Sequence, residues 1–406
     1  MDTWPMDTWP MDTTKTSSAP AAQVSGELAP FRVEIPQADL DDLHERLART
    51  RWPDELPDAG WDYGIPLGYV QELARYWRTD YDWRAYEAWL NEFPQFTTTI
   101  DGAKVHFMHV RSKEPDAMPL IITHGWPGSV VEFMNIIGPL TDPPAYGGDP
   151  ADAFHLVVPS IPGYAFSGPT QQAGWHMRRV AEAWAELMRR LGYERYGAQG
   201  GDWGSGISRD LGLVDPGHVV GVHLNMLSAP PPSDPTELAE LTDKEKGYLE
   251  RSARFRARGL GYGMIQSTRP QTLAYGLTDS PAGQLAWIAE KFKEWTDSKH
   301  WPEDAVDRDQ MLTNISVYWL TGTAGSSARL YYESARQGVW GPPQPSQVPT
   351  GVAVFPREIS PPIRRIAEKS NNVVHWSEFD RGGHFAAMEV PGLLVGDVRD
   401  FFSSLR

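Results

Sequence analysis

The sequence predicts an α/β fold in which helices cover both faces of a mostly parallel sheet. Short apolar runs of strand length alternate with amphipathic helical stretches over residues 119–226 and again over 341–406, and this alternation is typical of a parallel sheet. Residues 227–340 lack strand signals and contain helical runs and loops instead. A helical insert between strands of one sheet is expected to cap the carboxyl ends of the strands, where ligands of open α/β sheets bind.

The first 118 residues are predicted to divide into a tail and a separate module. Residues 1–30 open with the tandem repeat MDTWPMDTWPMDT and continue in Ser, Ala and Pro, so we expect a disordered tail or an artefact of the chosen start. The module, residues 31–118, begins with leucines at helical spacing, with Asp39 as the expected N-cap. It ends in FTTTIDGAKVHFMHV, where two β-rich runs flank Asp-Gly and predict a hairpin.

The remaining elements follow from run length and periodicity. Apolar runs of four to eight residues are taken as strands, and longer runs with a 3.6-residue period as helices. In chain order after the first helix, we expect helices at 70–77 and 83–90, a hairpin at 96–110, a strand at 119–123, a helix at 129–140, a strand at 153–160, a helix at 176–191, a strand at 196–200, a helix at 205–213, a strand at 219–225, cap helices at 280–296 and 308–323, strands at 351–356 and 372–379, and a closing helix at 392–405.

Composition excludes several classes of function. The chain of 406 residues has a formal net charge of −16 and no block of basic residues, which argues against binding nucleic acid or anionic membranes. Cysteine is absent, so disulfides, thiolate catalysis and Cys-ligated zinc are excluded. No apolar run is long enough for a transmembrane helix and no signal sequence is evident, so a cytoplasmic protein is expected. The 17 tryptophans favour packing at interfaces and hint at a homodimer.

The stretch YGAQGGDWGS resembles the sharp strand-to-helix turn that presents the nucleophile in α/β-hydrolases. Asp202 stands at its centre, between Gly200 and Gly204, after an apparent strand and before a helical run. The glycines suit a tight turn with close approach of helix and strand. Asp202 is therefore a candidate nucleophile; the alternative is an aspartate that only caps the following helix.

Two further loops carry candidate residues. HGWPGS follows an early strand directly, and in this fold the loop after that strand and the residue after the nucleophile supply the oxyanion donors. The backbone N–H groups of Trp126 and Trp203 are therefore expected to form an oxyanion hole, while His124 is interpreted as structural. His384, in DRGGHFAAMEVP near the end of the chain, is the expected base, since α/β-hydrolases follow the order nucleophile, acid, histidine.

The acid that orients His384 should follow a strand between the cap and that histidine. Glu358 lies just beyond the run GVAVFP and is the preferred candidate. Asp380 is the competitor, but it lies only four residues before His384 and is better interpreted as a carboxylate that caps a loop.

With these residues identified, the chain resembles the epoxide hydrolases of the α/β-hydrolase fold, specifically their microsomal-type branch. The resemblance rests on FRVEIPQADLDDLHERLARTRWPDE, HGWPGS, GGDWGS, FPREI and RGGHFAAME, and it covers nearly everything from Phe31 onward. Members of this family use two cap tyrosines. Local matches in GYGMIQSTRP and SSARLYYES place them at Tyr262 and Tyr331, with Tyr332 adjacent to the second. The MDTWP repeat replaces the membrane anchor of mammalian members, so a membrane location is not implied.

The resemblance implies hydrolysis of a lipophilic or aryl epoxide to a vicinal diol, with no metal or organic cofactor. The pathway served is either detoxification or secondary-metabolite biosynthesis, such as that of an antibiotic. Two alternatives remain. A haloalkane-type dehalogenase also uses an aspartate elbow, and Trp203 fits either enzyme. A catalytically inactive hydrolase fold would act as a binding protein. A serine esterase would need Ser205, which lies on the helix beyond the elbow.

Overall fold

The computed structural model describes residues 27–406 except 228, 230, 231, 233 and 339–342. Within these residues nine strands form one sheet in the order β1-β2-β3-β5-β4-β6-β7-β8-β9. Neighbours from β1 to β5 in that order are antiparallel, and those from β5 to β9 are parallel. The strands are β1 (Ala29–Phe31), β2 (Gln95–Ile100), β3 (Ala103–Val110), β4 (Met118–Thr123), β5 (Phe154–Pro159), β6 (Tyr196–Gly200), β7 (Val219–Leu224), β8 (Ser346–Val354) and β9 (Asn371–Glu378).

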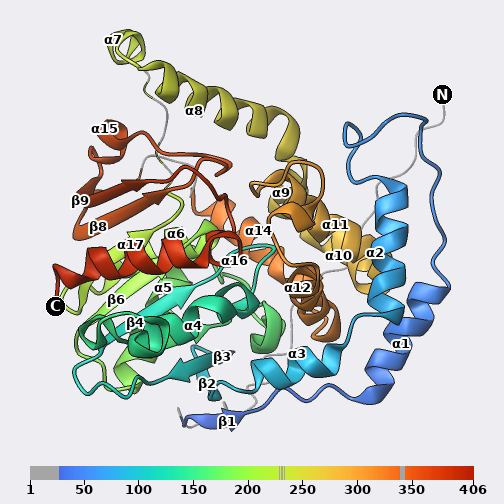
Figure 1. Cartoon of the computed structure of the whole chain (residues 1–406), viewed down its shortest axis with the longest axis horizontal. Helices are drawn as coiled ribbons and strands as arrows, with labels where there is room; N and C mark the ends of the chain where they lie inside the picture. The colour runs from blue at the N-terminus through green and yellow to red at the C-terminus, as the bar shows by residue number, and fades with distance from the viewer. Residues whose placement is uncertain (1–26, 228, 230–231, 233, 339–342) are drawn as a thin grey trace, which may run out of the picture.

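Helices cover both faces of this sheet, so the predicted α/β fold with a mostly parallel sheet is confirmed (Figure 1). On one face, α17 lies across a row of glycines in β6, β7 and β8, where any side chain would collide with Phe401 or Phe402. On the other face, α5 and α6 pack against each other and α6 against β6. The core helices are α4 (Met134–Thr141), α5 (Met177–Arg190), α6 (Asp202–Val214), α15 (Arg364–Ala367), α16 (Ala386–Glu389) and α17 (Pro391–Ser403), with short 3-10 turns at η1 (Val130–Phe133), η2 (Pro143–Tyr146), η3 (Pro150–Asp152) and η4 (Ala165–Ser167).

A helical insert separates β7 from β8. Between Leu224 and Ser346 the described residues contain helices and loops but no strand, as the sequence pattern predicted. Figure 1 shows most of this cap to the right of the sheet, with α7 and α8 above β8 and β9 in this view. The cap elements are α7 (Pro235–Ala239), α8 (Asp243–Arg254), the π-helical η5 (Phe255–Gly259), α9 (Gly261–Thr268), α10 (Pro270–Asp279), α11 (Pro281–Glu294), η6 (Pro302–Asp304), α12 (Arg308–Leu320), α13 (Ala324–Ser327) and α14 (Arg329–Arg336).

The N-terminal module contributes α1 (Gln37–Ala48), α2 (Leu67–Thr79), α3 (Trp83–Leu90) and the β2–β3 hairpin. The hairpin turns at Asp101 and Gly102, which both have positive φ (48° and 77°), as an Asp-Gly turn between twisted strands requires. Asp39 was expected to cap α1, but the helix begins two residues earlier, after Pro36, and Asp39 lies in its first turn. A carboxylate there still favours the helix through the helix dipole.

The boundary of the predicted N-terminal tail also needs correction. Residues 1–26, which include the MDTWP repeat, lie outside the described residues. Ala29 and Pro30, however, pair with Thr97 and Phe96 of β2, so these two residues belong to the sheet and not to the predicted tail. The proline lies on an edge strand, where its missing N–H costs no ladder hydrogen bond. The strand was not predicted because a proline in the sequence usually indicates that a segment is not a strand.

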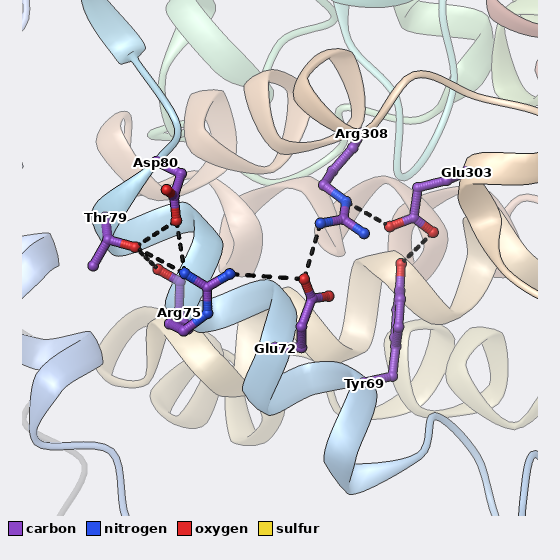
Figure 2. Close-up of polar contacts among 7 residues, drawn as sticks. All are labelled: Tyr69, Glu72, Arg75, Thr79, Asp80, Glu303 and Arg308. Carbon is purple, nitrogen blue, oxygen red and sulfur yellow. Dashed lines mark hydrogen bonds and ion pairs between the residues drawn. The ribbon is translucent and has the colours of Figure 1, made fainter.

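The module is joined to the cap by polar contacts as well as by packing. The Tyr69 hydroxyl donates to Glu303 at 3.0 Å, and Arg308 pairs with both Glu303 (2.8 Å) and Glu72 (3.0 Å), as Figure 2 shows. Deeper in the same contact, the Trp77 indole donates to Ser316 at 2.9 Å. The α2 helix is thereby fixed against η6 and α12. None of the helices in the described part of the chain is long and apolar enough to cross a membrane.

Candidate active site

The turn between β6 and α6 holds Asp202 in a strained backbone conformation. Its φ is 49°, in the left-handed region that non-glycine residues adopt rarely and mostly at functional sites. The neighbouring glycines leave room for this turn: a Cβ at Gly200 would lie 2.2 Å from the Gly204 carbonyl oxygen, and one at Gly204 would lie 1.9 Å from the Thr123 carbonyl oxygen. The helix therefore starts in direct contact with β4 and β6, and Asp202 projects from the apex.

The loop after β4 supplies a donor to this carboxylate. The Trp126 N–H donates to Asp202 Oδ1 at 2.7 Å. Gly125 makes this approach possible, since a Cβ there would lie 2.1 Å from the same oxygen. Trp203 is the next residue of α6. The structure thus places both predicted oxyanion residues beside Asp202, and the Trp126 N–H is hydrogen-bonded to it.

His384 connects Asp202 to a buried acid. Its Nδ1 donates to both carboxylate oxygens of Glu358, at 2.9 and 3.1 Å, and its Nε2 lies 3.5 Å from Asp202 Oδ2. That nitrogen makes no hydrogen bond within the described residues. The side chains of His384 and Glu358 are 2% and 1% exposed, whereas Asp202 retains 14%. Asp202 is therefore the member of the group that a ligand can reach.

Two loops after strands hold this arrangement. Glu358 follows β8, and the Ile359 N–H donates to its Oε1 at 2.7 Å. His384 follows β9, and its own N–H donates to the Trp295 carbonyl of the cap at 2.9 Å. Gly383 is required for this second contact, because a Cβ there would lie 2.6 Å from the same carbonyl. The cap therefore takes part in positioning the histidine.

The charges around His384 decide its protonation state. Burial alone lowers the pKa of the imidazole, but the carboxylates of Glu358 and Asp202 outweigh burial and raise that pKa well above its ordinary value of 6.5. The charged form of His384 is thus favoured while Asp202 is ionised. Loss of the Asp202 charge would remove one of the two groups that hold its proton.

Asp380 and His124, for which the sequence favours a structural role, lie in other environments. The side chain of Asp380 is 89% exposed and lies 4.0 Å from Arg381. His124 is buried, with Nδ1 bonded to the Gly125 carbonyl and Nε2 accepting from the Ile161 N–H, and burial lowers its pKa to about 4. Both nitrogens of His124 are therefore used in backbone contacts. The geometry favours Glu358 over Asp380 as the partner of His384.

Two cap tyrosines meet over the elbow. Tyr262 of α9 and Tyr331 of α14 are buried with ring centroids 5.9 Å apart. The Tyr262 ring stacks on Trp126 (4.8 Å, 11°), and the Tyr331 ring meets Trp203 edge-on at 4.7 Å. Burial, together with the negative charge of Asp202, raises the pKa of both phenols. Tyr332 points elsewhere, since its hydroxyl accepts from Arg336 at 3.2 Å.

Sequence reasoning missed one carboxyl group of this region. Glu132 folds back over Gly128, where a Cβ would lie 1.3 Å from its Oε1. Burial raises the pKa of Glu132 to about 8, and both His384 and Asp202 act on it electrostatically. Its spacing from Ser129, S-x-x-E, matches a helix-capping pattern. The sequence therefore suggests a capping role for Glu132 and gives no sign that it lies near Asp202. No group of three or more His, Asp or Glu side chains suited to a metal ion occurs in the part of the chain that the structure describes.

Comparisons with known proteins agree with this geometry. Residues 28–133 match the family model for the epoxide hydrolase N terminus, and residues 118–259 match that for the alpha/beta hydrolase fold. A protein of Stigmatella aurantiaca (strain DW4/3-1) named as an epoxide hydrolase is 49% identical over 380 residues, which cover 93% of this chain and 86% of that protein. Epoxide hydrolase 1 of Sus scrofa is 37% identical over 414 residues, covering 96% and 91%.

Solved structures extend the similarity to the whole architecture. The epoxide hydrolase of Aspergillus niger superposes with a TM-score of 0.83 at 35% identity, covering 94% of this chain and 98% of that one. The juvenile hormone epoxide hydrolase of Bombyx mori gives 0.86 at 32%, covering 94% and 96%. Because both the core and the N-terminal module are shared over nearly the full length, the chain belongs to the epoxide hydrolases of the α/β-hydrolase fold.

Proposed function

We propose that this enzyme opens a lipophilic or aryl epoxide through a covalent ester on Asp202, which water then hydrolyses to release a vicinal diol. One observation carries this proposal: the accessible Asp202 carboxylate lies between a buried His384–Glu358 pair and two buried phenols, Tyr262 and Tyr331. A nucleophile, a base for water and acids for the leaving oxygen are thus present in one place. Such a set fits displacement at a strained ether followed by ester hydrolysis.

The first step forms the ester. A carboxylate is already anionic at neutral pH and needs no base to attack an epoxide carbon. The Trp126 N–H holds Oδ1, so Oδ2 is the oxygen that forms the new bond. As the ring C–O bond breaks, the oxygen that leaves accepts a proton from Tyr262 or Tyr331, and a tyrosinate results. Protonation matters because an alkoxide is a poor leaving group.

The second step regenerates the enzyme. Once the ester has removed the charge of Asp202, His384 releases its proton to solvent, and its free Nε2 then deprotonates a water that attacks the carbonyl carbon of the Asp202 ester. Negative charge then develops on Oδ1, where the Trp126 N–H already donates and the Trp203 N–H is the expected second donor. One such donor contributes about 2.7–4 kcal/mol in related acyl chemistry. The imidazolium returns its proton to the departing diol oxygen, and the second proton of the water restores the tyrosine. His384 takes a proton up again when Asp202 is restored.

The aromatic surroundings support the expected substrate class. Trp126, Trp203, Tyr262 and Tyr331 contact one another around Asp202, and their rings present apolar surface with a few polar donors. Sites of this composition bind apolar ligands and orient them through those donors. An aryl epoxide such as styrene oxide is therefore a suitable first substrate.

Isotope labelling tests the covalent step. In a single turnover with enzyme in excess in oxygen-18 water, the first diol should carry unlabelled oxygen taken from Asp202, while the label enters the carboxylate. Label in that first diol would show direct attack by water and would rule out Asp202 as the nucleophile. The Asp202→Ala variant serves as the blank and should form no diol.

Two further assays address the alternative functions. Halide release from chloroalkanes, with no diol formed from any epoxide, would instead support a haloalkane-type dehalogenase. Tight binding of epoxides without turnover by the intact protein would support an inactive binding protein. We expect diol formation and no halide release.

A further inference from the structure

Lys291 of α11 is a buried cation next to the proposed active site. Its side chain is 4% exposed, although lysine is almost never buried unless it is paired. The ammonium pairs with Glu290 at 2.5 Å and with Glu294 at 3.6 Å. Neither partner requires the lysine to be buried, because both carboxylates lie on the same helix and are more exposed.

The ammonium group faces two aromatic rings of the site. It lies 4.9 Å from the ring centroid of Tyr262 and 5.9 Å from that of Trp295. These are distances at which a cation is attracted to the face of an aromatic ring. The Tyr262 ring stacks on Trp126 at 4.8 Å, so the tyrosine is held between an indole and a buried cation.

From this placement we infer that Lys291 is a positioning residue that aligns Tyr262 and favours its proton transfer to the epoxide oxygen. The inference rests on the proposed role of Tyr262. When a phenol gives its proton away, its ring gains negative charge, and attraction to a nearby cation becomes stronger. An interaction that is stronger in the transition state than in the ground state accelerates the step concerned.

The charges that face Tyr262 act in both directions. Burial and the carboxylate of Asp202 raise the pKa of the phenol, and Glu294 raises it too. Tyr331 lies close and lowers it. Glu294 also pairs with Lys291 and offsets part of its charge. The net effect of the ammonium therefore depends on its place over the ring. Removal of Lys291 should slow ester formation, whereas removal of the Glu294 charge should speed it.

The inference concerns one chemical step. Tyr262 serves the opening of the epoxide, whereas His384 serves the hydrolysis of the ester. Loss of Lys291 should therefore slow ester formation while the hydrolysis of the ester continues at its usual rate. A lysine that only stabilised the cap would either leave both rates unchanged or, if the cap shifted, lower both.

Stopped-flow single turnovers of styrene oxide separate the two rates. Lys291→Met keeps the length of the side chain and removes the charge. We expect ester formation to slow about tenfold, equivalent to about 1.4 kcal/mol, and ester hydrolysis to stay within about twofold. Lys291→Arg should recover most of the rate. Lys293→Met is the matched control, since Lys293 lies on the same helix but faces Trp61 at 5.9 Å.

A second variant tests the charge without altering a buried lysine. Glu294→Gln removes a carboxylate that is 39% exposed, so its fold should be unaffected. It should speed ester formation by about twofold to threefold, as expected for loss of a partly screened charge. Equal slowing of both steps in Lys291→Met, or unchanged ester formation in Lys291→Met, would overturn the inference.

Tyr262→Phe distinguishes this inference from the proposed function beneath it. If Tyr262→Phe leaves ester formation unchanged, the role of the tyrosine itself is wrong. If Tyr262→Phe slows that step but Lys291→Met does not, only the role of Lys291 is wrong. If both slow it, the double variant should be no slower than Tyr262→Phe alone, because the lysine would act through the tyrosine.

Discussion

The charge of Asp202 acts together with that of Glu358 on the protonation of His384. The carboxylates of Asp202 and Glu358 together raise the pKa of the imidazole well above 6.5. In the proposed ester, Asp202 is neutral, so one of these two charges is lost when the first step is complete. The histidine then holds its proton less tightly and becomes able to accept one from water. Ester formation thereby prepares the base for the next step.

Asp202→Asn imitates the neutral ester and tests this coupling. We expect the pKa of His384 to be lower in the variant than in the wild type, because the imidazolium loses one favourable neighbour and remains buried. An NMR titration of the His384 ring measures both values. Asp380→Asn is the control, since that carboxylate is exposed, and should leave the titration unchanged. An equal pKa in Asp202→Asn and the wild type would contradict the coupling.

At the scale of elements, the position of α6 depends on close backbone contact. Gly204 lies where the first turn of the helix meets β4, and a Cβ there would lie 1.9 Å from the Thr123 carbonyl oxygen. That obstacle is backbone, which cannot rotate away as a side chain does. The elbow and the sheet are therefore a single rigid unit.

Gly204→Ala should push the first turn of α6 away from β4. We expect a loss of stability of about 3 kcal/mol or more, in the range of overpacking and strain, together with loss of diol formation as Asp202 moves. Urea unfolding gives the first value and a styrene oxide assay the second. Gly217→Ala is the matched control, because a Cβ there meets nothing within 4 Å. Equal stability of the two variants would show that the close contact of Gly204 with Thr123 does not determine the stability of the fold.

The contact between α2 and the cap depends on Arg308, which bridges Glu72 and Glu303 (Figure 2). Arg308→Met should cost about 1 kcal/mol, the upper end for partly exposed ion pairs, because two pairs are lost together. Arg49→Met is the control: this arginine is 77% exposed and pairs with Glu45 of its own helix, α1, so a few tenths of a kcal/mol are expected. Urea unfolding compares the two, and equal losses would argue against a joint between module and cap.

At the scale of the whole molecule, the C-terminal helix α17 is joined to the sheet through Asp397. This buried carboxylate accepts from His223 of β7 and His375 of β9, both at 2.8 Å. Burial alone raises the pKa of Asp397, but these hydrogen bonds outweigh it and lower the pKa to about 2, from the ordinary 3.8. The folded state therefore binds fewer protons than the unfolded state between these two values.

The stability of the fold should reflect this shift at acid pH. The contribution of Asp397, about 2 kcal/mol, is present above pH 3.8 and is lost as the pH falls towards 2. In Asp397→Asn this loss should be missing, so the stability of the variant should fall less steeply over that range. Urea unfolding at several pH values measures the slopes. Asp116→Asn is the control, since Asp116 is exposed. An unchanged slope in Asp397→Asn would contradict the lowered pKa of Asp397.

The sequence by itself determined the class of the fold, most elements and the positions of the reactive groups along the chain. Strand and helix periodicity depends on local burial, and the Gly-Asp-Gly elbow depends on local backbone geometry, so neither needs distant contacts to be recognised. The errors lie where a local pattern has two interpretations. Pro30 lies in a strand because an edge tolerates it, and Glu132 matches a cap pattern but lies near Asp202.

Only the tertiary structure decided which of these groups act on one another. Asp202, Glu358 and His384 are separated by 156 and 26 residues, and their distances follow from the order of strands in the sheet. The same holds for Lys291 over Tyr262, since two cap helices must pack before the cation meets the ring. Chemistry of this kind depends on distance and burial, which a linear pattern does not contain.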